Sequence, residues 1–209
     1  MIFQDILKKE QIYLYCGDYN GNNKSFIGLS LHQSNDSHIK HDITLKTPLF
    51  DNSVDIIQSE DVFEHIDYEK LHNVIDECYR ILKPGGLLRI SVPDYRCDVL
   101  YNRSVKDSFG NVIFDKGGGG SYDQKTKKVI GGGHVWFPNY EKVSELLCNS
   151  AFKKEGIIEF LHYYDENNTP VMKSIDYQKG YIQRTPDHDK RVQNPRRPMS
   201  IVVDCYKKK

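Results

Sequence analysis

The pattern of hydrophobic and polar positions is clearest between residues 50 and 94, where it predicts a strand, a helix and a second strand. Residues 54–57 form a short β-branched apolar run, as in a strand buried in a parallel sheet. Residues 71–82 repeat apolar side chains at spacings of three and four, which is one face of an amphipathic helix. The KPGG segment 83–86 ends this helix, and the apolar run 87–92 follows. We therefore expect a βαβ unit with two parallel strands.

Weaker patterns predict the other elements of an α/β domain. Further strands are expected at 12–15, 25–31, 39–44, 156–160 and 199–206. A short helix is expected within residues 1–10, and a longer one at 139–151, with Asn139 as its N-cap. Residues 20–24 are predicted to form a polar, Gly/Asn-rich loop in place of a long helix between the first two strands.

Two long stretches interrupt this pattern. Residues 95–135 contain two glycine runs and little periodicity, and residues 165–198 are polar with few apolar anchors. Long loops in compact domains are uncommon and are often functional. We expect residues 95–135 to form a glycine-rich insertion or lid, with a disordered surface insertion as the alternative, and residues 165–198 to form a polar excursion.

Length and composition narrow the function classes. The 209 residues predict a single domain spanning 1–209. Lys plus Arg (29) equals Asp plus Glu (29), so no global field favours nucleic acid or an anionic membrane. No apolar run approaches the length of a membrane span, and residues 1–17 lack the order of a signal peptide, so a cytoplasmic protein is expected.

The five cysteines are scattered, without a CxxC or Cys/His ligand spacing. Neither a disulfide framework nor a metal site is therefore predicted. Cys78 and Cys148 fall on apolar helix faces, and both are expected to be small buried side chains.

The block 50–94 also carries a family resemblance, through FDNSVDII, then EHI, then RILKPGGLLRISVPD. It resembles the class I (Rossmann-like) S-adenosylmethionine (SAM)-dependent methyltransferase superfamily, and is similar to small methyltransferase domains associated with glycan biosynthesis. The resemblance implies an α/β fold with a seven-stranded, mostly parallel sheet, its last strand antiparallel, and helices on both faces. It also implies SAM as cofactor and S-adenosylhomocysteine as product.

Ligands of open α/β sheets bind at the carboxyl ends of the strands. With the resemblance, this rule implies a cofactor site formed by Cys16, Gly17, Ser30, Leu31, His32, Asp42, Ile43, Ser59 and Glu60. Gly17 is the glycine that remains of the family's glycine-rich turn, since Tyr15 takes the place of another. Ser30 stands where the family usually has a ribose-binding carboxylate, and a satisfied strand-end hydroxyl is the alternative.

Asp42 matches the family's adenine site, with an Asx turn as the alternative. Glu60 is expected to bind the ammonium group of SAM. The pair Glu64-His65 is frequent at this place in the family, and a helix-start carboxylate with a packed histidine explains it equally well.

His134 and Asp94 are the candidate catalytic residues. Methyl transfer to oxygen requires alignment of the reacting atoms and a base for the hydroxyl proton. His134 precedes the predicted helix at 139–151 and is expected to be that base, with packing on Trp136 as the alternative. Asp94 ends the strand at 87–92 and is expected to orient the acceptor.

A saccharide acceptor is expected, because residues 95–135 and 165–198 are rich in Tyr, Asn, Asp and Arg and lack an apolar stripe. The basic run of the second stretch indicates either a solvated surface or a phosphate clamp, with RNA less favoured; it comprises Arg184, Lys190, Arg191, Arg196 and Arg197. One alternative is a non-catalytic binding module that has the methyltransferase fold without the activity and belongs to a larger glycan-modifying polypeptide or assembly. The other is a methyltransferase that acts on RNA, protein or a small molecule. A Rossmann-type oxidoreductase would need a GxGxxG turn, which is missing.

Overall fold

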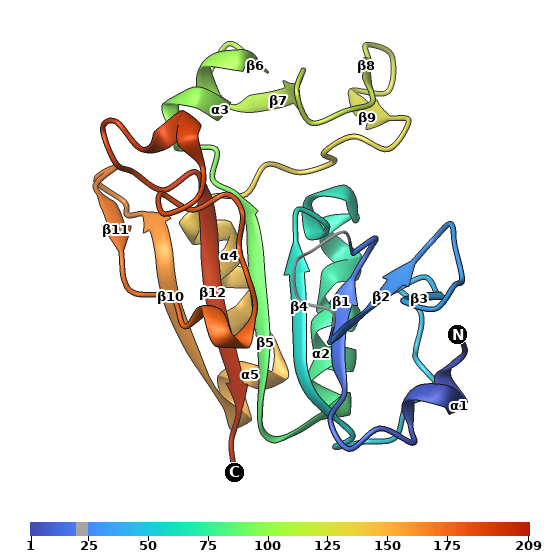
Figure 1. The fold of residues 1–209 in the computed structure, drawn as a ribbon. Helices are drawn as coiled ribbons and strands as arrows, with labels where there is room; N and C mark the ends of the chain where they lie inside the picture. The colour runs from blue at the N-terminus through green and yellow to red at the C-terminus, as the bar shows by residue number, and fades with distance from the viewer. Residues whose placement is uncertain (20–24) are drawn as a thin grey trace.

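The computed structural model describes residues 1–19 and 25–209, so the loop predicted at 20–24 lies outside the described residues. The described chain forms one eight-stranded sheet, two small hairpins and the helices that pack around them (Figure 1). The α-helices and 3-10 helices (η) are α1 (Phe3–Ile6), η1 (Phe63–His65), η2 (Tyr68–Lys70), α2 (Leu71–Ile81), α3 (Asp98–Arg103), α4 (Tyr140–Cys148), α5 (Ala151–Glu155), η3 (Tyr177–Lys179) and η4 (Lys190–Val192). The strands are β1 (Tyr13–Cys16), β2 (Phe26–Ser30), β3 (His38–Lys40), β4 (Val54–Glu60), β5 (Leu82–Pro93), β6 (Ser104–Lys106), β7 (Val112–Asp115), β8 (Ser121–Asp123), β9 (Lys128–Ile130), β10 (Gly156–Tyr164), β11 (Pro170–Met172) and β12 (Ser200–Lys207).

The large sheet has the strand order β11-β10-β12-β5-β4-β1-β2-β3. Strands β1 to β5 pair in parallel, while β12 lies antiparallel between β5 and β10. The predicted mostly parallel sheet with an antiparallel last strand is therefore confirmed. The sheet has eight strands and not seven, because β11 forms a hairpin with β10. A three-residue strand that begins with proline has no periodicity from which it could be predicted.

The predicted βαβ unit is present. β4 pairs in parallel with β5, with Ile56 opposite Leu87 and Glu60 opposite Ser91. Helix α2 buries the predicted apolar face against the sheet, and β5 begins directly after it at Leu82, with a turn at Gly85, whose φ is 82°, before the regular pairing from Leu87. Since an L side chain is strained at that φ, the KPGG segment has the residue that this turn requires.

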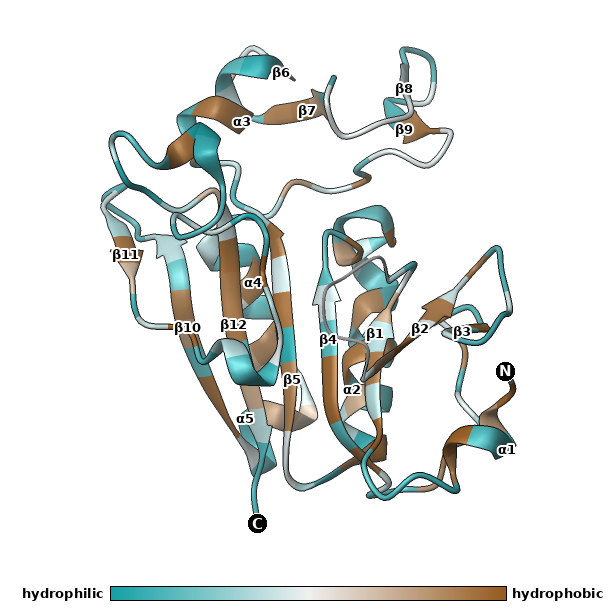
Figure 2. Cartoon of the chain, viewed as in Figure 1, coloured by the Kyte–Doolittle hydropathy of each residue, from teal (hydrophilic) through white to brown (hydrophobic). Residues whose placement is uncertain are grey.

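The two faces of the sheet are covered differently. Helices α2, α4 and α5 contact one another and pack on one face, over the apolar side chains that point toward them. The opposite face of β4, β5 and β12 is covered by the segment 173–198, whose described helical turns are η3 and η4 (Figure 1). Helices thus cover one face of the sheet as predicted, whereas a mostly irregular segment covers the other face. Figure 2 shows this segment mostly as hydrophilic residues beside the hydrophobic β12.

A buried arginine explains this second layer. Arg89 of β5 is fully buried and pairs with Asp204, its register partner on β12, through bonds of 2.7 and 2.8 Å. Its remaining nitrogen donates to the backbone carbonyls of Asp176 and Gly180 at 2.8 and 2.9 Å. A buried cation needs all of its donors satisfied, so the segment 173–198 completes the solvation of Arg89.

Two local predictions differ from the structure, the end of β3 and the burial of Cys148. β3 ends at Lys40, because the chain turns at residues 42–45 before the predicted end at 44. The predicted insertion 95–135 contains α3 and the hairpins β6–β7 and β8–β9, which lie beyond the carboxyl ends of the central strands (Figure 1). Cys148 is exposed, although Cys78 is buried as expected. Strands of three or four residues are too short to give a readable alternation.

Asn139 caps α4 as predicted: its side chain accepts a hydrogen bond from the backbone N–H of Lys142 at 3.0 Å.

Across residues 1–19 and 25–209, no helix is both long and apolar enough to span a bilayer.

Breaking the Arg89–Asp204 pair should be costly. Asp204→Ala leaves the guanidinium buried without its counter-charge, and we expect the free energy of unfolding to fall by about 3–5 kcal/mol in urea titrations. The matched control is Asp67→Ala, which removes the exposed pair Lys70–Asp67, with side chains 61% and 65% exposed, and should cost at most ~1 kcal/mol. Equal losses in the two variants would contradict this account of Arg89.

Candidate functional site

Two adjoining pockets lie at the carboxyl ends of β1, β2 and β4. The first has a volume of about 320 Å³, within the usual range for small-molecule sites, and the second about 190 Å³. Asp18 lines both pockets, so we treat them together as the strand-end groove. The first pocket is lined by Gly17, Asp18, Leu29, Leu31, His32, His41, Asp42, Ile43, Thr44, Val62, His65, Ile66, Asp67 and Lys70. The second is lined by Tyr15, Asp18, Tyr19, Glu60, Asp61, Tyr181 and Gln183.

Most of the predicted cofactor residues meet in this groove. Five of them line the first pocket, namely Gly17, Leu31, His32, Asp42 and Ile43. Glu60 lines the second pocket. Cys16, Ser30 and Ser59 are buried and line neither. The strand-end rule therefore located the groove, and the three buried residues support its wall.

The turn after β1 brings the backbone close to the groove. Gly17 has a φ of 102°, and its N–H donates to the carbonyl of Leu29 at 2.9 Å. A Cβ at this position would lie 3.1 Å from Cγ2 of Val62. Both the backbone angle and the close neighbour therefore favour glycine here.

Ser30 binds Asp18, which follows the first strand and is one of the strand-end positions, although it was not among the predicted cofactor residues. The Ser30 hydroxyl accepts from the backbone N–H groups of His32 and Gln33 at 3.0 and 3.1 Å. Hydrogen bonds from Ser30 and then Gln33 lower the pKa of Asp18. These bonds fit the alternative of a satisfied strand-end hydroxyl for Ser30, and Asp18 is the carboxylate that lines the groove beside it.

Asp42 forms an Asx turn and also lines the first pocket. Its Oδ1 accepts from the backbone N–H and the hydroxyl of Thr44 at 2.9 and 2.8 Å, which is an Asx turn. Burial raises the pKa of Asp42, but the two Thr44 hydrogen bonds more than offset this effect, so the pKa is lowered overall. The carboxylate is therefore ionised at neutral pH and borders the groove.

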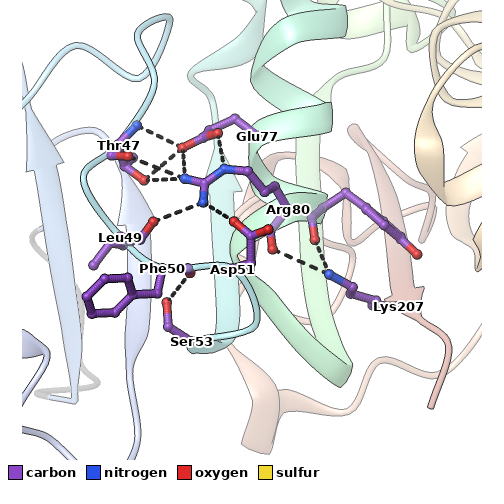
Figure 3. Close-up of polar contacts among 9 residues, drawn as sticks. Thr47, Leu49, Phe50, Asp51, Ser53, Glu77, Arg80 and Lys207 are labelled. Atoms are coloured by element: carbon purple, nitrogen blue, oxygen red, sulfur yellow. Dashed lines mark hydrogen bonds and ion pairs between the residues drawn. The ribbon is translucent and has the colours of Figure 1, made fainter.

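An arginine network holds the segment that follows Asp42 (Figure 3). Arg80 of α2 donates to both carboxylate oxygens of Glu77 at 2.8 and 2.7 Å, and to the backbone carbonyl of Leu49 at 2.9 Å. Arg80 also pairs with Asp51, and Glu77 accepts from the backbone N–H and hydroxyl of Thr47 at 2.8 Å. Because one guanidinium joins α2 to residues 47–51, the chain between β3 and β4 has a defined path beside the groove.

The second pocket brings two neighbouring carboxyl groups together, Glu60 and Asp61. Glu60 accepts from the backbone N–H of Gln183 at 2.7 Å, and burial, followed by the nearby Asp61, raises its pKa to about 7. Asp61 has a φ of 54°, unusual for a non-glycine residue, and pairs with Arg184 at 2.9 Å. Burial also raises the pKa of Asp61. These contacts bring the segment 173–198 to the groove, so the polar excursion predicted at 165–198 borders it.

His134 lies in a separate buried cluster next to the groove. Its Nδ1 is 2.5 Å from the Tyr95 hydroxyl, which donates to Asp115 at 2.7 Å, and Arg103 holds Asp115 by two bonds of 2.7 and 2.6 Å. Its Nε2 faces the carboxylate of Glu64 at 3.7 Å. Burial, with a further contribution from His65, lowers the pKa of His134 to about 4. The imidazole is therefore neutral at pH 7.

The two glycine runs of 95–135 enclose His134. A Cβ on Gly118 would lie 2.7 Å from the His134 ring, and one on Gly133 would lie 2.2 Å from the Gly119 carbonyl oxygen. The runs 117–120 and 131–133 therefore pack backbone against backbone, which side chains would prevent. Trp136 does not stack on His134; its indole N–H donates to the Phe63 carbonyl at 2.8 Å.

Asp94 lies away from the groove. It is fully buried, and its two oxygens accept from the backbone N–H groups of Arg96 and Tyr164 at 3.0 and 2.9 Å. Burial raises its pKa to about 6. The carboxylate joins the end of β5 to the end of β10, and this arrangement does not support the predicted contact with an acceptor.

The basic run predicted as a phosphate clamp is paired with carboxylates. Arg184 pairs with Asp61, Arg191 with Asp189, Arg196 with Asp187 and Arg197 with Asp98. These pairs balance the charge of the four arginines, which favours the solvated-surface interpretation.

The pKa of Glu60 predicts a pH effect on stability. A carboxyl group whose pKa rises from 4.5 in the unfolded chain to about 7 in the folded one stabilises the fold below pH 4.5, and this contribution is lost as the pH rises through 7. We expect wild type to lose on the order of 2–3 kcal/mol relative to Glu60→Gln over this window, measured by urea unfolding. For the exposed control Glu69→Gln, the free energy of unfolding should vary with pH as it does in wild type. If Glu60→Gln also showed the pH dependence of wild type, the raised pKa of the buried Glu60 would be contradicted.

Comparison with known proteins now gives this site a context. Residues 5–90 match the family described as "Methyltransferase domain". A curated protein of Mycolicibacterium smegmatis, named a probable S-adenosylmethionine-dependent methyltransferase, is 36% identical over 56 residues, which are 27% of this chain and 21% of that protein. The matched region thus spans about a fifth of the length of that relative.

Solved structures of the same fold extend over most of the chain. A SAM-dependent methyltransferase from Mesorhizobium loti matches with a TM-score of 0.53 and 17% identity, covering 94% of this chain and 90% of that one. One from Clostridium acetobutylicum matches with a TM-score of 0.52 and 13% identity, covering 95% and 85%. The 1,6-didemethyltoxoflavin N1-methyltransferase of Burkholderia thailandensis, solved with S-adenosylhomocysteine, matches at 0.51 and 7%, covering 95% and 72%. The chain therefore has the α/β Rossmann-like fold of SAM-dependent methyltransferases, and its residues 5–90 match the methyltransferase domain family.

Proposed function

We propose that this chain is a SAM-dependent methyltransferase that methylates a hydroxyl oxygen of a saccharide acceptor. The observation that carries the proposal is the strand-end groove, in which Asp42, Asp18 and Glu60 lie at the carboxyl ends of the parallel strands. Ligands of this type of sheet bind at that edge. The match of residues 5–90 to the methyltransferase domain family supports the same conclusion.

The groove offers a suitable partner for each part of the cofactor. Asp42 and the neighbouring backbone of Ile43 form the adenine end, and Asp18 accepts from the ribose hydroxyls in place of Ser30. Glu60 and Asp61 provide carboxyl oxygens that can accept hydrogen bonds from the ammonium group. The positive φ of Gly17 lets the backbone approach between the two ends. When bound, SAM supplies an electrophilic methyl group on a sulfonium sulfur.

His134 accepts the proton of the acceptor hydroxyl in this scheme. Tyr95 donates its single proton to Asp115, so the short Tyr95–His134 contact requires a proton on Nδ1 of His134. This leaves the lone pair on Nε2, and the His134 ring packs edge-on against His65, a residue lining the groove. The neutral imidazole is therefore oriented to take a proton at Nε2.

The surroundings of the groove support a polar acceptor. Tyr181 and Gln183 reach it from the segment 173–198, and the hairpins of 95–135 lie beyond the strand ends (Figure 1). Hydroxyl, amide and carboxylate groups match the hydrogen-bonding surface of a sugar, whereas a lipid acceptor would favour an apolar channel.

Removing the adenine-side carboxylate should weaken cofactor binding. We expect Asp42→Ala to cost about 1–3 kcal/mol of SAM affinity in calorimetry, since a bound polar group loses its partner. Asp42→Asn preserves an acceptor for the Thr44 turn and should also lose affinity, which separates recognition from loop structure. The control Asp36→Ala alters an exposed residue between β2 and β3 and should bind SAM like wild type. Unchanged affinity in both Asp42 variants would reject the assignment.

Replacing the base should affect chemistry and not cofactor binding. His134→Ala is expected to lower kcat by about 10²–10⁴-fold with nearly constant SAM affinity, while His72→Ala on α2 should leave both unchanged.

The acceptor class is tested with methyl-labelled SAM and a panel of saccharides, proteins, RNA and small molecules. Label in a saccharide is the expected result; label only in another class would refute the saccharide acceptor, and SAM binding without any transfer would indicate a binding module.

A further inference from the structure

Three side chains with metal-ligating atoms converge beside the groove. They are Glu64 and His65 of η1 and His134 of the segment after β9, and one ligand atom from each lies within 4.8 Å of the others. Glu64 and His65 are adjacent, but His134 lies far from them along the chain, so the sequence shows no compact ligand spacing and no metal site was predicted. What brings them together is a set of contacts between η1 and the segment 131–136.

Those contacts include hydrogen bonds to two backbone carbonyls of η1. The N–H of Val135 donates to the Glu64 carbonyl at 2.8 Å, and the Trp136 indole N–H donates to the Phe63 carbonyl at 2.8 Å. These hydrogen bonds hold the segment 131–136 against η1, and the exposed His65 is itself held by the contact of its Nδ1 with the Gly132 carbonyl.

Hydrogen bonds orient both histidines with Nε2 free. His134 must carry its proton on Nδ1, because the Tyr95 oxygen has given its own proton to Asp115 and can only accept. The Nδ1 of His65 lies 3.0 Å from the Gly132 carbonyl, which can only accept, so Nδ1 is protonated there too. Imidazoles fixed in this way by a carbonyl or a carboxylate-linked partner are the usual form of metal-ligating histidines.

Glu64 supplies the third ligand. Its side chain is fully buried, and neither carboxylate oxygen has a hydrogen-bond partner among residues 1–19 and 25–209. One oxygen lies 3.7 Å from Nε2 of His134, too far for a hydrogen bond. Two ligand atoms that are each about 2.0–2.2 Å from one zinc ion can lie at most ~4.4 Å apart, so this separation fits a shared ion. A buried acceptor opposite a second acceptor requires a cation or a proton between them.

We propose that Glu64, His65 and His134 bind a divalent transition-metal ion, with Zn²⁺ as the best match. Two imidazoles and one carboxylate form the ligand set of open, catalytic zinc sites, in which a further coordination position takes water or substrate. His65 is exposed and lines the groove, so an ion bound here is reachable from solvent and faces the groove. Arg103, Asp115 and Tyr95 form the outer shell that orients His134.

The binding claim is independent of the proposed function, but the role of the ion rests on it. The open coordination position of the bound ion would take the acceptor hydroxyl. The charge of the ion would then favour loss of the hydroxyl proton. The Nε2 lone pair of His134 would then serve as a ligand, and the hydroxyl proton would leave to solvent or to a neighbouring group. His134→Ala lowers activity in either scheme, so metal binding itself must be measured.

The experiment is a titration of the chelator-treated protein with Zn²⁺ alone, by calorimetry, with Co²⁺ absorption as a second readout. We expect wild type to bind one equivalent of Zn²⁺ and to give the d–d bands of a low-coordinate Co²⁺ site. Glu64→Gln and His134→Asn should each weaken binding by more than tenfold. Tyr95→Phe removes the acceptor for the Nδ1 proton and should weaken it by about 10–100-fold. The matched controls Glu69→Gln and His72→Asn lie outside the cluster and should bind like wild type.

No stoichiometric binding by folded wild-type protein would overturn the proposal, as would equal affinities in wild type and Glu64→Gln. Circular dichroism and urea unfolding establish that each variant is folded, and Tyr95→Phe provides a test that leaves all three ligands in place. A parallel SAM titration separates the two hypotheses. Zn²⁺ binding without SAM binding supports the metal site and refutes the cofactor assignment, and the reverse result refutes the metal site alone.

Discussion

The buried ion pair between Arg89 and Asp204 is the interaction on which the second layer of this protein depends. Both residues lie on neighbouring central strands and face away from the helices, where an apolar sheet would normally carry more helices. Arg89 instead recruits the carbonyls of Asp176 and Gly180, and Gln58 adds a bond to the Tyr181 carbonyl at 2.8 Å. A Cβ on Gly180 would meet the Gln58 side chain at 2.0 Å, so the close approach of this segment needs glycine. Removing one charge would strand the other in the interior, which is why the pair and its covering segment stabilise each other.

The same segment continues into the groove. Beyond Gly180, the backbone N–H of Gln183 binds Glu60, and Arg184 pairs with Asp61. The carboxylates after β4 are thus held by backbone and guanidinium groups that the Arg89 network positions. Arg80 plays a comparable role for residues 47–51, between β3 and β4 (Figure 3). Each of these two arginines therefore fixes the path of one irregular segment, residues 173–198 for Arg89 and residues 47–51 for Arg80.

The acceptor side is organised by hydrogen-bond polarity. Arg103 binds Asp115, Asp115 accepts from Tyr95, and Tyr95 accepts from His134, so one tautomer of His134 follows from the chain of donors. The glycine runs that pack over this histidine exclude bulk water from it. The result is a neutral imidazole beside a buried carboxylate without a hydrogen-bond partner among the described residues. This arrangement is suited to holding a proton or a metal ion, because a buried carboxylate without a partner is energetically unfavourable.

The sequence alone determined the elements whose pattern is local. The spacing of Leu71, Val74 and Ile75 predicts α2, the β-branched runs predict β4 and β5, and the strand-end rule placed Asp42 and Glu60 in the groove. Tertiary structure decided which polar residues meet. Asp18 replaces Ser30 at the groove, Asp94 turns inward to the backbone, and Glu64 and His134 converge although they are far apart along the chain. Periodicity depends on which face of one element is buried, and this can be read from neighbouring residues. The meeting of distant polar residues depends on how separate elements pack against one another. Buried charges such as Arg89 determine that packing through partners far away in sequence, which no local pattern reveals.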